Sequence, residues 1–329
     1  MKLLEKVRNK LSVVKTVVAQ AEPSNGRALG IALDFLYCKL RFQVSSEEYL
    51  KYRYYQYQNR YRKNFLLVHH QHHDYRYISP VGLAKYKFYT TISDCYSREI
   101  IRGSVSGEEG FLEFVRKHKK VISKPDGGTY GRGIDIFTYE NDEQALAYFR
   151  QKPGETVYEE LIRQHDALAA LNPHCVNSIR ILALRKKGSV EILSATLKTS
   201  STEGTFVDNM HSGGIGAMVD LETGIVYTFG YDYEGNKYTH HPITGTQFIG
   251  LNIPHWEDAV ALVKKAHARM RGSGILGWDI AITPTGADII EANNRPGPLL
   301  TQVMDGIPKG EKVLLSIKQA KRKKKKKKR

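Results

Sequence analysis

The sequence predicts an α+β protein with mostly antiparallel strands in at least two layers, preceded by a helical N-terminal region. Two observations carry this prediction. Short apolar runs are separated by turn residues such as Lys-Lys-Gly and Thr-Pro-Thr-Gly, which is typical of β-hairpins. Longer segments between them repeat apolar residues at spacings of three and four, which indicates amphipathic helices.

The composition is that of a globular protein with room for about two domains. The chain has 329 residues, of which 41% are hydrophobic and 26% charged, and its three cysteines are far apart without a CxxC pair. This pattern favours neither a disulfide framework nor a zinc site, so we expect a reducing, cytoplasmic location. No stretch approaches the roughly 20 apolar residues that cross a bilayer. Residues 1–21 predict an amphipathic helix rather than a signal peptide.

The formal net charge of +16 is unevenly distributed. The last nine residues, Lys321 to Arg329, are all basic, so the rest of the chain carries about +7. We expect residues 316–329 to be a disordered basic tail. Such a tail suits an anionic membrane surface, which makes the inner face of the membrane a candidate attachment site. Nucleic acid is the less favoured partner, and a tail that only aids solubility is the third interpretation.

Residues 1–80 are the predicted helical N-terminal region. Between Ser45 and Asp74, tyrosines recur at helical spacing among Lys and Arg residues. Aromatic and basic residues interleaved in this way can bind nucleic acid, but they more often form a helix that packs its Tyr rings inward beneath Lys and Arg stems. The same segment contains His69, His70, His72 and His73. We do not expect a metal there, because neighbouring positions on a helix diverge and no ligand partner follows at a fixed spacing.

From about residue 105 onward, helices and strands alternate. We expect helices at 111–119, 143–150 and 256–271. Strands are expected at 121–124, 134–137, 156–161, 178–184, 189–197, 214–219 and 224–229. Turns at Lys186-Lys187-Gly188 and Glu222-Thr223-Gly224 would join successive strands into hairpins.

The most informative segment is residues 277–297, where two apolar runs flank the turn Thr283-Pro284-Thr285-Gly286. If the hairpin pivots at Thr285, Asp279 and Glu291 are each six residues from the pivot and lie opposite one another. Asn293 shares a face with Glu291, because side chains alternate along a strand. Two carboxylates and an amide oxygen would converge into a hard oxygen site that suits Mg²⁺.

The alternative for this hairpin is a solvated pair of strands with scattered acidic residues. It is disfavoured by four apolar residues that would bury the opposite face: Trp278, Ile280, Ile282 and Ile290. The repulsion between two carboxylates this close is removed by a divalent cation, which also favours the metal site.

A glycine-rich loop follows Lys124 and extends to Gly133. Glycines allow backbone N–H groups to close around phosphate oxygens. The loop is not a Walker loop, because no Gly-Lys-[Ser/Thr] follows at a helix start, and it joins two strands, unlike a Rossmann fingerprint. Alone, such a loop is nearly as consistent with a purely structural turn.

The order of these features resembles the ATP-grasp superfamily: Lys124 on a strand, the glycine loop, a strand ending in Glu159-Glu160-Leu161, and then Asp279 with Glu291-Ala292-Asn293. Further segments look like the sugar-transfer-associated ATP-grasp family and are similar to the ribosomal-protein glutamate ligases. They are Ile122–Pro125, Gln164–Leu168, Val176–Arg180 and Asn209-Met210-His211-Ser212-Gly213-Gly214. The resemblance covers roughly residues 80–315. It implies a domain at 81–315 in which two α+β subdomains, at about 110–200 and 200–315, clasp ATP.

The resemblance also implies nucleotide-binding roles. Lys124 would contact the α and β phosphates. The flap over the phosphates would be Gly127, Gly128, Thr129, Gly131 and Gly133. The hinge at the adenine would be Glu159, Glu160 and the backbone of Leu161. His165 or Asp166 would hold the ribose hydroxyls.

The catalytic roles follow in the same way. Arg180 and Lys198, on the two strands of one hairpin, could face the γ-phosphate, although each could instead be a structural residue of the sheet. Asn209 and His211 would close the reaction end, where His211 could also be a structural hydrogen bonder. Asp279, Glu291 and Asn293 would hold one or two Mg²⁺ ions, with Mn²⁺ as an alternative. Arg295 would meet the acyl phosphate or the substrate carboxylate.

Together these features lead us to expect an ATP-dependent ligase that activates a carboxylate as an acyl phosphate and joins it to an amine, in glycan or sugar-linked biosynthesis. A kinase that phosphorylates a hydroxyl group and a non-catalytic nucleotide-binding protein are the alternatives.

Overall fold

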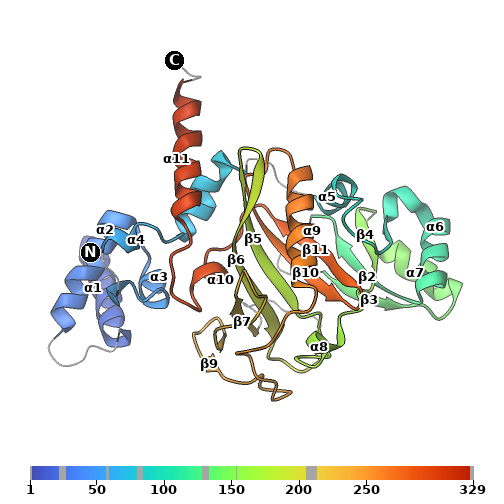
Figure 1. Cartoon of the computed structure of the whole chain (residues 1–329), viewed down its shortest axis with the longest axis horizontal. Helices are drawn as coiled ribbons and strands as arrows, with labels where there is room; N and C mark the ends of the chain where they lie inside the picture. The colour runs from blue at the N-terminus through green and yellow to red at the C-terminus, as the bar shows by residue number, and fades with distance from the viewer. Residues whose placement is uncertain are drawn as a thin grey trace. The chain divides into compact units, whose positions relative to one another are not determined.

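The computed structural model of the chain describes residues 2–21, 27–56, 59–79, 84–127, 133–152, 154–204 and 213–326 (Figure 1). Its contacts divide the chain into two compact units. We call residues 1–78 and 295–329 the helical unit, and residues 79–294 the sheet unit. Residues 295–315 therefore group with the N-terminal region and not with the domain expected at 81–315. No helix in the described part of the chain is long and apolar enough to cross a membrane.

The helical unit is built from short helices and turns. Its longer helices are α1 (Lys2–Gln20), α2 (Ala28–Phe42) and α11 (Glu311–Lys326). The shorter elements are α3 (Ser46–Lys51), η1 (Tyr54–Gln56), α4 (Asn59–Arg62), the π-helical turn η2 (His70–Asp74), η3 (Tyr75–Tyr77) and α10 (Leu299–Gln302). The helix α1 matches the amphipathic helix expected at 1–21.

Tyrosines form the core of the helical unit. Tyr49, Tyr52 and Tyr54 are completely buried, and the ring of Tyr52 stacks on that of Phe65. The sequence interpretation that these rings pack inward therefore holds. One continuous helix does not form, because Arg53 takes a left-handed φ of 49° after α3 and redirects the chain.

The expected disordered tail over residues 316–329 is instead helical as far as Lys326. Two apolar residues at its start, Val313 and Ile317, are buried and anchor it. Lys321 Nζ lies 2.5 Å from Asp74 Oδ1 and above the ring of Tyr77. Because lysine is also a good helix former, these anchors extend the helix into the basic run.

The first sheet of the sheet unit has four antiparallel strands in the order β1-β4-β2-β3. They are β1 (Ile100–Arg102), β2 (Lys120–Pro125), β3 (Asp135–Thr138) and β4 (Thr156–Glu160). The helices α6 (Gly103–His118), which is kinked at Gly107, and α7 (Asp142–Gln151) contribute to its core through Phe111, Phe114 and Ala145. The glycine-rich loop joins β2 to β3, as the sequence predicts.

The second sheet has seven strands in the order β11-β10-β5-β6-β7-β8-β9. They are β5 (Ser178–Lys186), β6 (Ser189–Ser200), β7 (Gly214–Val219), β8 (Gly230–Tyr231), β9 (Lys237–Tyr238), β10 (Ile275–Thr283) and β11 (Gly286–Asn293). Because β5 and β6 pair with each other and with β10 and β7, the subdomain boundary expected near residue 200 falls inside one sheet. Two short helices, α5 (Lys85–Thr91) and α8 (Asp166–Ala169), complete the sheet unit with α9.

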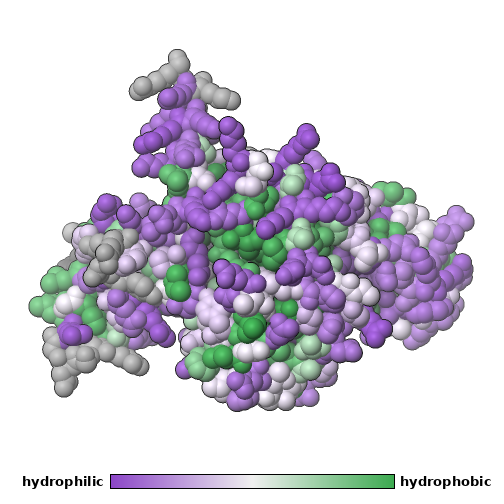
Figure 2. Space-filling model, in the orientation of Figure 1, coloured by the Kyte–Doolittle hydropathy of each residue, from purple (hydrophilic) through white to green (hydrophobic). Residues whose placement is uncertain are grey.

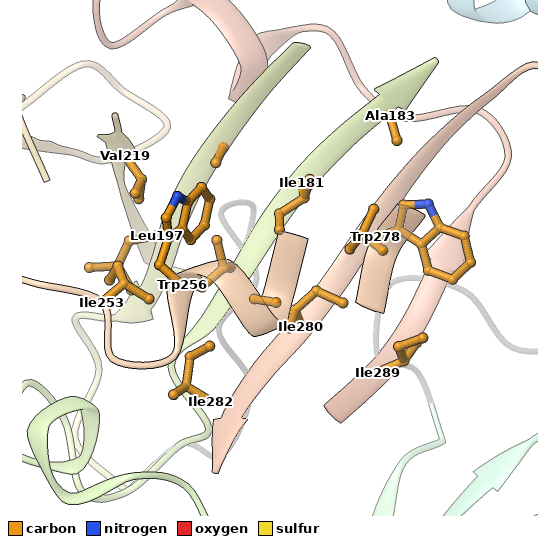
Figure 3. Close-up of a cluster of buried hydrophobic side chains, with 14 of the residues drawn as sticks. Ile181, Ala183, Leu197, Val219, Ile253, Trp256, Trp278, Ile280, Ile282 and Ile289 are labelled. Carbon is orange, nitrogen blue, oxygen red and sulfur yellow. The ribbon is translucent and has the colours of Figure 1, made fainter. Parts of the chain in front are cut away.

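The helix α9 (Trp256–Arg269) packs on this large sheet and closes the main core. Figure 3 shows Trp256 beside Leu197 and Ile253, and Trp278 at the other side of the same cluster. All of these side chains are at most 6% exposed. The sheet therefore presents one apolar face to α9, which leaves the opposite face for polar side chains.

Two further expectations, both about strands, need correction. Residues 224–229 form no strand; Val226 makes only an isolated bridge with Val219, and the next strand begins at Gly230. In the hairpin, Ile289 rather than Ile290 joins the buried face with Trp278 and Ile280. A bulge causes this shift, because Asp279 pairs with Glu291 while Ile280 pairs with Ile289, so Ile290 is the extra residue.

Candidate functional site

The hairpin of β10 and β11 brings the three predicted metal ligands to one face. Asp279 is directly opposite Glu291 in the register, and Gly277 is opposite Asn293. Asn293 Nδ2 donates a hydrogen bond to Glu291 Oε1 at 3.1 Å. The amide nitrogen is thereby oriented toward the carboxylate, and the amide oxygen remains as a donor for a cation.

Two cations from the neighbouring strands meet Asp279. Arg180, opposite Asp279 on β5, donates from Nε and Nη2 to the two carboxylate oxygens at 2.5 and 2.7 Å. Lys198 Nζ, from β6, lies 3.4 Å from Asp279 Oδ1. Burial alone would raise the pKa of Asp279, but Arg180 and Lys198 outweigh it and hold that pKa well below its usual range. Asp279 is therefore ionised at neutral pH.

This donor set fits Mg²⁺. It offers two carboxylates and one amide oxygen, which are the hard ligands that Mg²⁺ prefers. The same face carries Arg180 and Lys198, so it can hold a divalent cation and the anionic groups bound to it. The structure thus brings together five of the predicted site residues on three adjacent strands and β11: Arg180, Lys198, Asp279, Glu291 and Asn293.

A second buried network surrounds Lys124. Its Nζ lies 2.9 Å from Glu159 Oε2, and both side chains are under 10% exposed. Arg98 approaches the same oxygen at 3.1 Å and also pairs with Asp288 Oδ2 at 3.0 Å. The hydroxyl of Tyr89 lies 2.8 Å from Glu159 Oε1. These charges hold the pKa of Glu159 below its usual value against the opposing effect of burial, which is the largest single influence.

The sequence did not predict that the side chain of Glu159 is part of a buried ion network. Its carboxylate points into the protein and is saturated by Lys124, Arg98 and Tyr89, so only its backbone faces the predicted hinge. Because Asp288 lies on β11 and Glu159 on β4, Arg98 ties the hairpin of β10 and β11 to the four-stranded sheet. A lone arginine in Ser97-Arg98-Glu99 gives no sequence signal for this role.

The rest of the predicted hinge lies at the end of β4. Glu160 accepts a hydrogen bond from the N–H of Glu99 at 3.1 Å, and so faces away from Glu159. Leu161 follows in an irregular segment. His165 is the N-cap of α8, where its Nδ1 accepts from the N–H of Ala167, and Asp166 is exposed in the first turn. Between the two candidate ribose ligands, Asp166 is the one whose side chain is open to solvent.

Several predicted residues lie outside the described part of the chain: Gly128, Thr129, Gly131, Asn209 and His211. Of the flap, Gly127 and Gly133 are described. Gly133 has a φ of 74°, and a Cβ there would lie 2.9 Å from Pro125, so only glycine fits this position. Arg295 belongs to the helical unit, where its carbonyl accepts from Gln71 Nε2 at 2.8 Å.

Lys85, at the start of α5, is a further cation near the site. Burial is the main cause that lowers its pKa, and the charges that act on it include Glu291, Lys124, Asp126 and Glu159. It therefore lies among both groups of site residues. No local motif marks it in the sequence.

The lowered pKa values of Asp279 and Glu159 predict how the stability of the protein depends on pH. Because their folded pKa values lie below the ordinary values of 3.8 for Asp279 and 4.5 for Glu159, the unfolded chain takes up protons first as the pH falls. Their contribution to the free energy of unfolding is complete above about pH 4.5 and declines below it. Urea denaturation between neutral pH and about pH 3 should show a smaller loss for Asp279→Asn than for the wild type. Equal losses would contradict the assignment.

The chain is similar to one family of known proteins. The profile of the sugar-transfer associated ATP-grasp family matches residues 51–313. The match begins well before the resemblance expected from residue 80, so it includes much of the tyrosine-rich segment. None of the curated proteins compared with the chain matches it.

The chain is also similar to solved structures. One is the ATP-grasp ligase PsnB complexed with minimal precursor, Mg and ADP, with 10% identity, a TM-score of 0.38, and coverage of 65% of this chain and 50% of that one. Carboxyaminoimidazole ribonucleotide synthase from Aspergillus clavatus complexed with ATP shares 12% identity, with a TM-score of 0.40 and coverage of 67% and 45%. D-alanyl-alanine synthetase A from Vibrio cholerae shares 12%, with a TM-score of 0.44 and coverage of 72% and 65%.

The chain spans about half the length of the first two of these structures. The assignment therefore rests on the family profile, which covers well over half of this chain. The chain belongs to the sugar-transfer associated ATP-grasp family.

Proposed function

We propose that the protein is an ATP- and Mg²⁺-dependent ligase that joins a carboxylate to an amine. The observation that carries the proposal is the shared face of Asp279, Glu291 and Asn293, with Arg180 and Lys198 beside it. A site with this charge pattern can hold a metal and the phosphates that the metal binds. The solved structures named above include an ATP-grasp ligase with Mg and ADP, which is consistent with this choice.

Mg²⁺, when bound by Asp279, Glu291 and Asn293, would neutralise charge on the β and γ phosphates. Lys124 would contact the α and β phosphates beneath the glycine loop, and the backbone at Leu161 would meet the adenine. Arg180 and Lys198 would release Asp279 in part and turn toward the γ-phosphate, where their charge stabilises the transferring group. Asn209 and His211 would close the acceptor side.

The reaction then has two steps. An oxygen of the substrate carboxylate attacks the γ-phosphorus, the bond from that phosphorus to the β,γ-bridging oxygen breaks, and ADP leaves. The amine next attacks the acyl carbon, the carbon–oxygen bond to phosphate breaks, and inorganic phosphate leaves with the amine proton passing to water. The protein contributes mainly position and charge, because phosphoryl transfer asks for little covalent participation from side chains.

For the substrates, the family's association with sugar transfer favours an acid that is part of, or attached to, a glycan. This extension rests on family membership. We place the protein in the cytoplasm, with the basic residues of α11 and the tail against the inner face of the membrane. Removal of Lys321–Arg329 should then weaken binding to anionic vesicles.

A kinase that phosphorylates a hydroxyl group is the second candidate, because the same residues would suit either acceptor. Hydroxylamine separates the two. A ligase that forms an acyl phosphate should convert pooled amino acids and uronic acids into hydroxamates in its presence, with stoichiometric ADP. ADP release with a phosphorylated product and no hydroxamate would instead identify a kinase.

A further inference from the structure

The helix α2 is apolar on two opposite faces. On one face, Phe35 and Cys38 are buried in the core of the helical unit. On the other, four leucines are spaced by four, three and four residues, so they line up along one side of the helix. We call these the leucine stripe: Leu29, Leu33, Leu36 and Leu40, which are 72%, 59%, 43% and 86% exposed.

A contiguous apolar stripe open to water is unusual on a protein surface. A helix that is hydrophobic around its whole circumference is normally buried on all sides, and exposed apolar patches mark contact sites. Tyr37, 43% exposed, borders the stripe and widens it. We therefore expect a partner or a surface to bury the leucine stripe.

The exposed charged side chains of α2 itself are positive. Lys39 and Arg41 are exposed on the same helix. The one acidic residue of α2, Asp34, is held by the guanidinium of Arg62 and by the hydroxyl of Tyr49. Within the same unit, α11 ends in the basic run that begins at Lys321, and Figure 2 shows this helix covered by hydrophilic side chains.

We propose that the leucine stripe inserts into the interface of an anionic bilayer. The leucines would lie at the boundary between headgroups and acyl chains, with Lys39 and Arg41 at the phosphates. Stable attachment of a peripheral protein takes two signals, an apolar one and an electrostatic one, and α2 and the basic run supply one each. The choice of an anionic bilayer rests on the membrane location given under the proposed function. The insertion itself does not depend on the ligase reaction.

A second copy of the chain fits the stripe less well. Five partly exposed side chains offer only part of the roughly 800 Å² per partner that a stable interface buries. The stripe covers fewer than two heptads, whereas coiled coils are sustained over about three or more. Two copies would also bring Lys39 and Arg41 together without an acidic residue on this face to pair with them.

Tryptophan fluorescence tests the insertion directly. The two native tryptophans are at most 6% exposed, so their emission gives a constant background. Leu40→Trp should shift to the blue when vesicles of equal parts phosphatidylglycerol and phosphatidylcholine are added. Ile225→Trp, at an exposed position of the sheet unit, is the matched control and should not shift.

Vesicle flotation of the full chain measures the contribution of the stripe to binding. Leu33→Asp/Leu40→Asp, with its fold checked by circular dichroism, should lower the partition coefficient by about tenfold or more, because two buried leucines are lost. Removal of Lys321–Arg329 should weaken binding and make it less sensitive to salt, while Leu40→Trp in that background still shifts at saturating lipid.

Three results would overturn the proposal. Vesicle binding without a shift of Leu40→Trp would mean that the basic run alone attaches the protein. A blue shift that rises with protein concentration in the absence of vesicles, with a doubled mass in light scattering, would mean that the stripe joins two copies. No binding to any vesicle would reject both membrane signals and leave the ligase proposal untouched, since activity is assayed without lipid.

Discussion

Glu291→Gln is expected to lower ATP-dependent turnover by roughly 10² to 10³-fold, the loss typical when one preorganised charge-stabilising group is removed. Glu291 lies opposite Asp279 and accepts a hydrogen bond from Asn293, so its carboxylate neighbours both of the other ligands of the proposed metal site. The amide keeps the shape of the side chain and removes its charge. Initial rates of ADP release at saturating ATP would measure the effect.

Two controls make this result specific. Glu257→Gln changes an exposed glutamate at the start of α9 and should leave the rate unchanged. A higher Mg²⁺ concentration should restore part of the activity of Glu291→Gln, because weaker metal binding is compensated by mass action. Full turnover in Glu291→Gln at low Mg²⁺ would refute the assignment of the metal site.

Arg98→Met is expected to destabilise the sheet unit by about 3–5 kcal/mol, the usual effect of removing one partner from a buried ion network. Arg98 is 4% exposed at its side chain and pairs with Glu159 and Asp288, which are equally buried. The substitution leaves Asp288 without its cation and Glu159 with Lys124 alone among its charged partners. Urea denaturation at neutral pH would report the change in the free energy of unfolding.

Arg150→Met is the matched control for this experiment. Arg150 pairs with Glu108 through two hydrogen bonds, but both side chains are largely exposed. Exposed pairs contribute little to stability because water and salt screen them, so this variant should be nearly as stable as the wild type. Similar losses in the two variants would show that the buried network is not a principal tie between β4 and β11.

The hairpin of β10 and β11 could be predicted from the sequence, because its turn depends on local chemistry. The pairs nearest the turn, from Thr283 with Gly286 to Ile280 with Ile289, place its pivot between Pro284 and Thr285 rather than at Thr285, so counting alone would set Asp279 opposite Ile290. The bulge at Ile290 could not be predicted in this way, since inserting one residue changes no local pattern. It exchanges Ile290 for Ile289 in the core and brings Glu291 opposite Asp279.

The roles of residues that depend on partners far away in the sequence could not be predicted. Arg98 gains its position from Glu159 and Asp288, 61 residues and more along the chain, and no spacing rule encodes such a contact. The helical continuation of the basic run likewise depends on Asp74, which lies far from Lys321 in sequence. Charge patterning alone predicts repulsion and disorder there, because it cannot include a tertiary partner.

The pairing of Arg180 with Asp279 illustrates a site that the sequence identified residue by residue without predicting how its members interact. Of the two alternatives that were open for Arg180, the structure shows the pairing with an acid of the sheet, and the phosphate contact stays a prediction. The guanidinium now neutralises the carboxylate that we assign to the metal. If nucleotide and metal bind, the metal cation would take the place of Arg180 at the Asp279 carboxylate, and the nucleotide phosphates would take the place of Asp279 at Arg180.

The most direct test of the proposed ligase is product analysis of the full-length protein with ATP, Mg²⁺ and pooled amino acids, uronic acids and amines. We expect ADP and phosphate release that requires both an acid and an amine, with a product whose mass equals the sum of the two minus water. ADP release that needs only one acceptor and yields a product heavier by one phosphoryl group would contradict it.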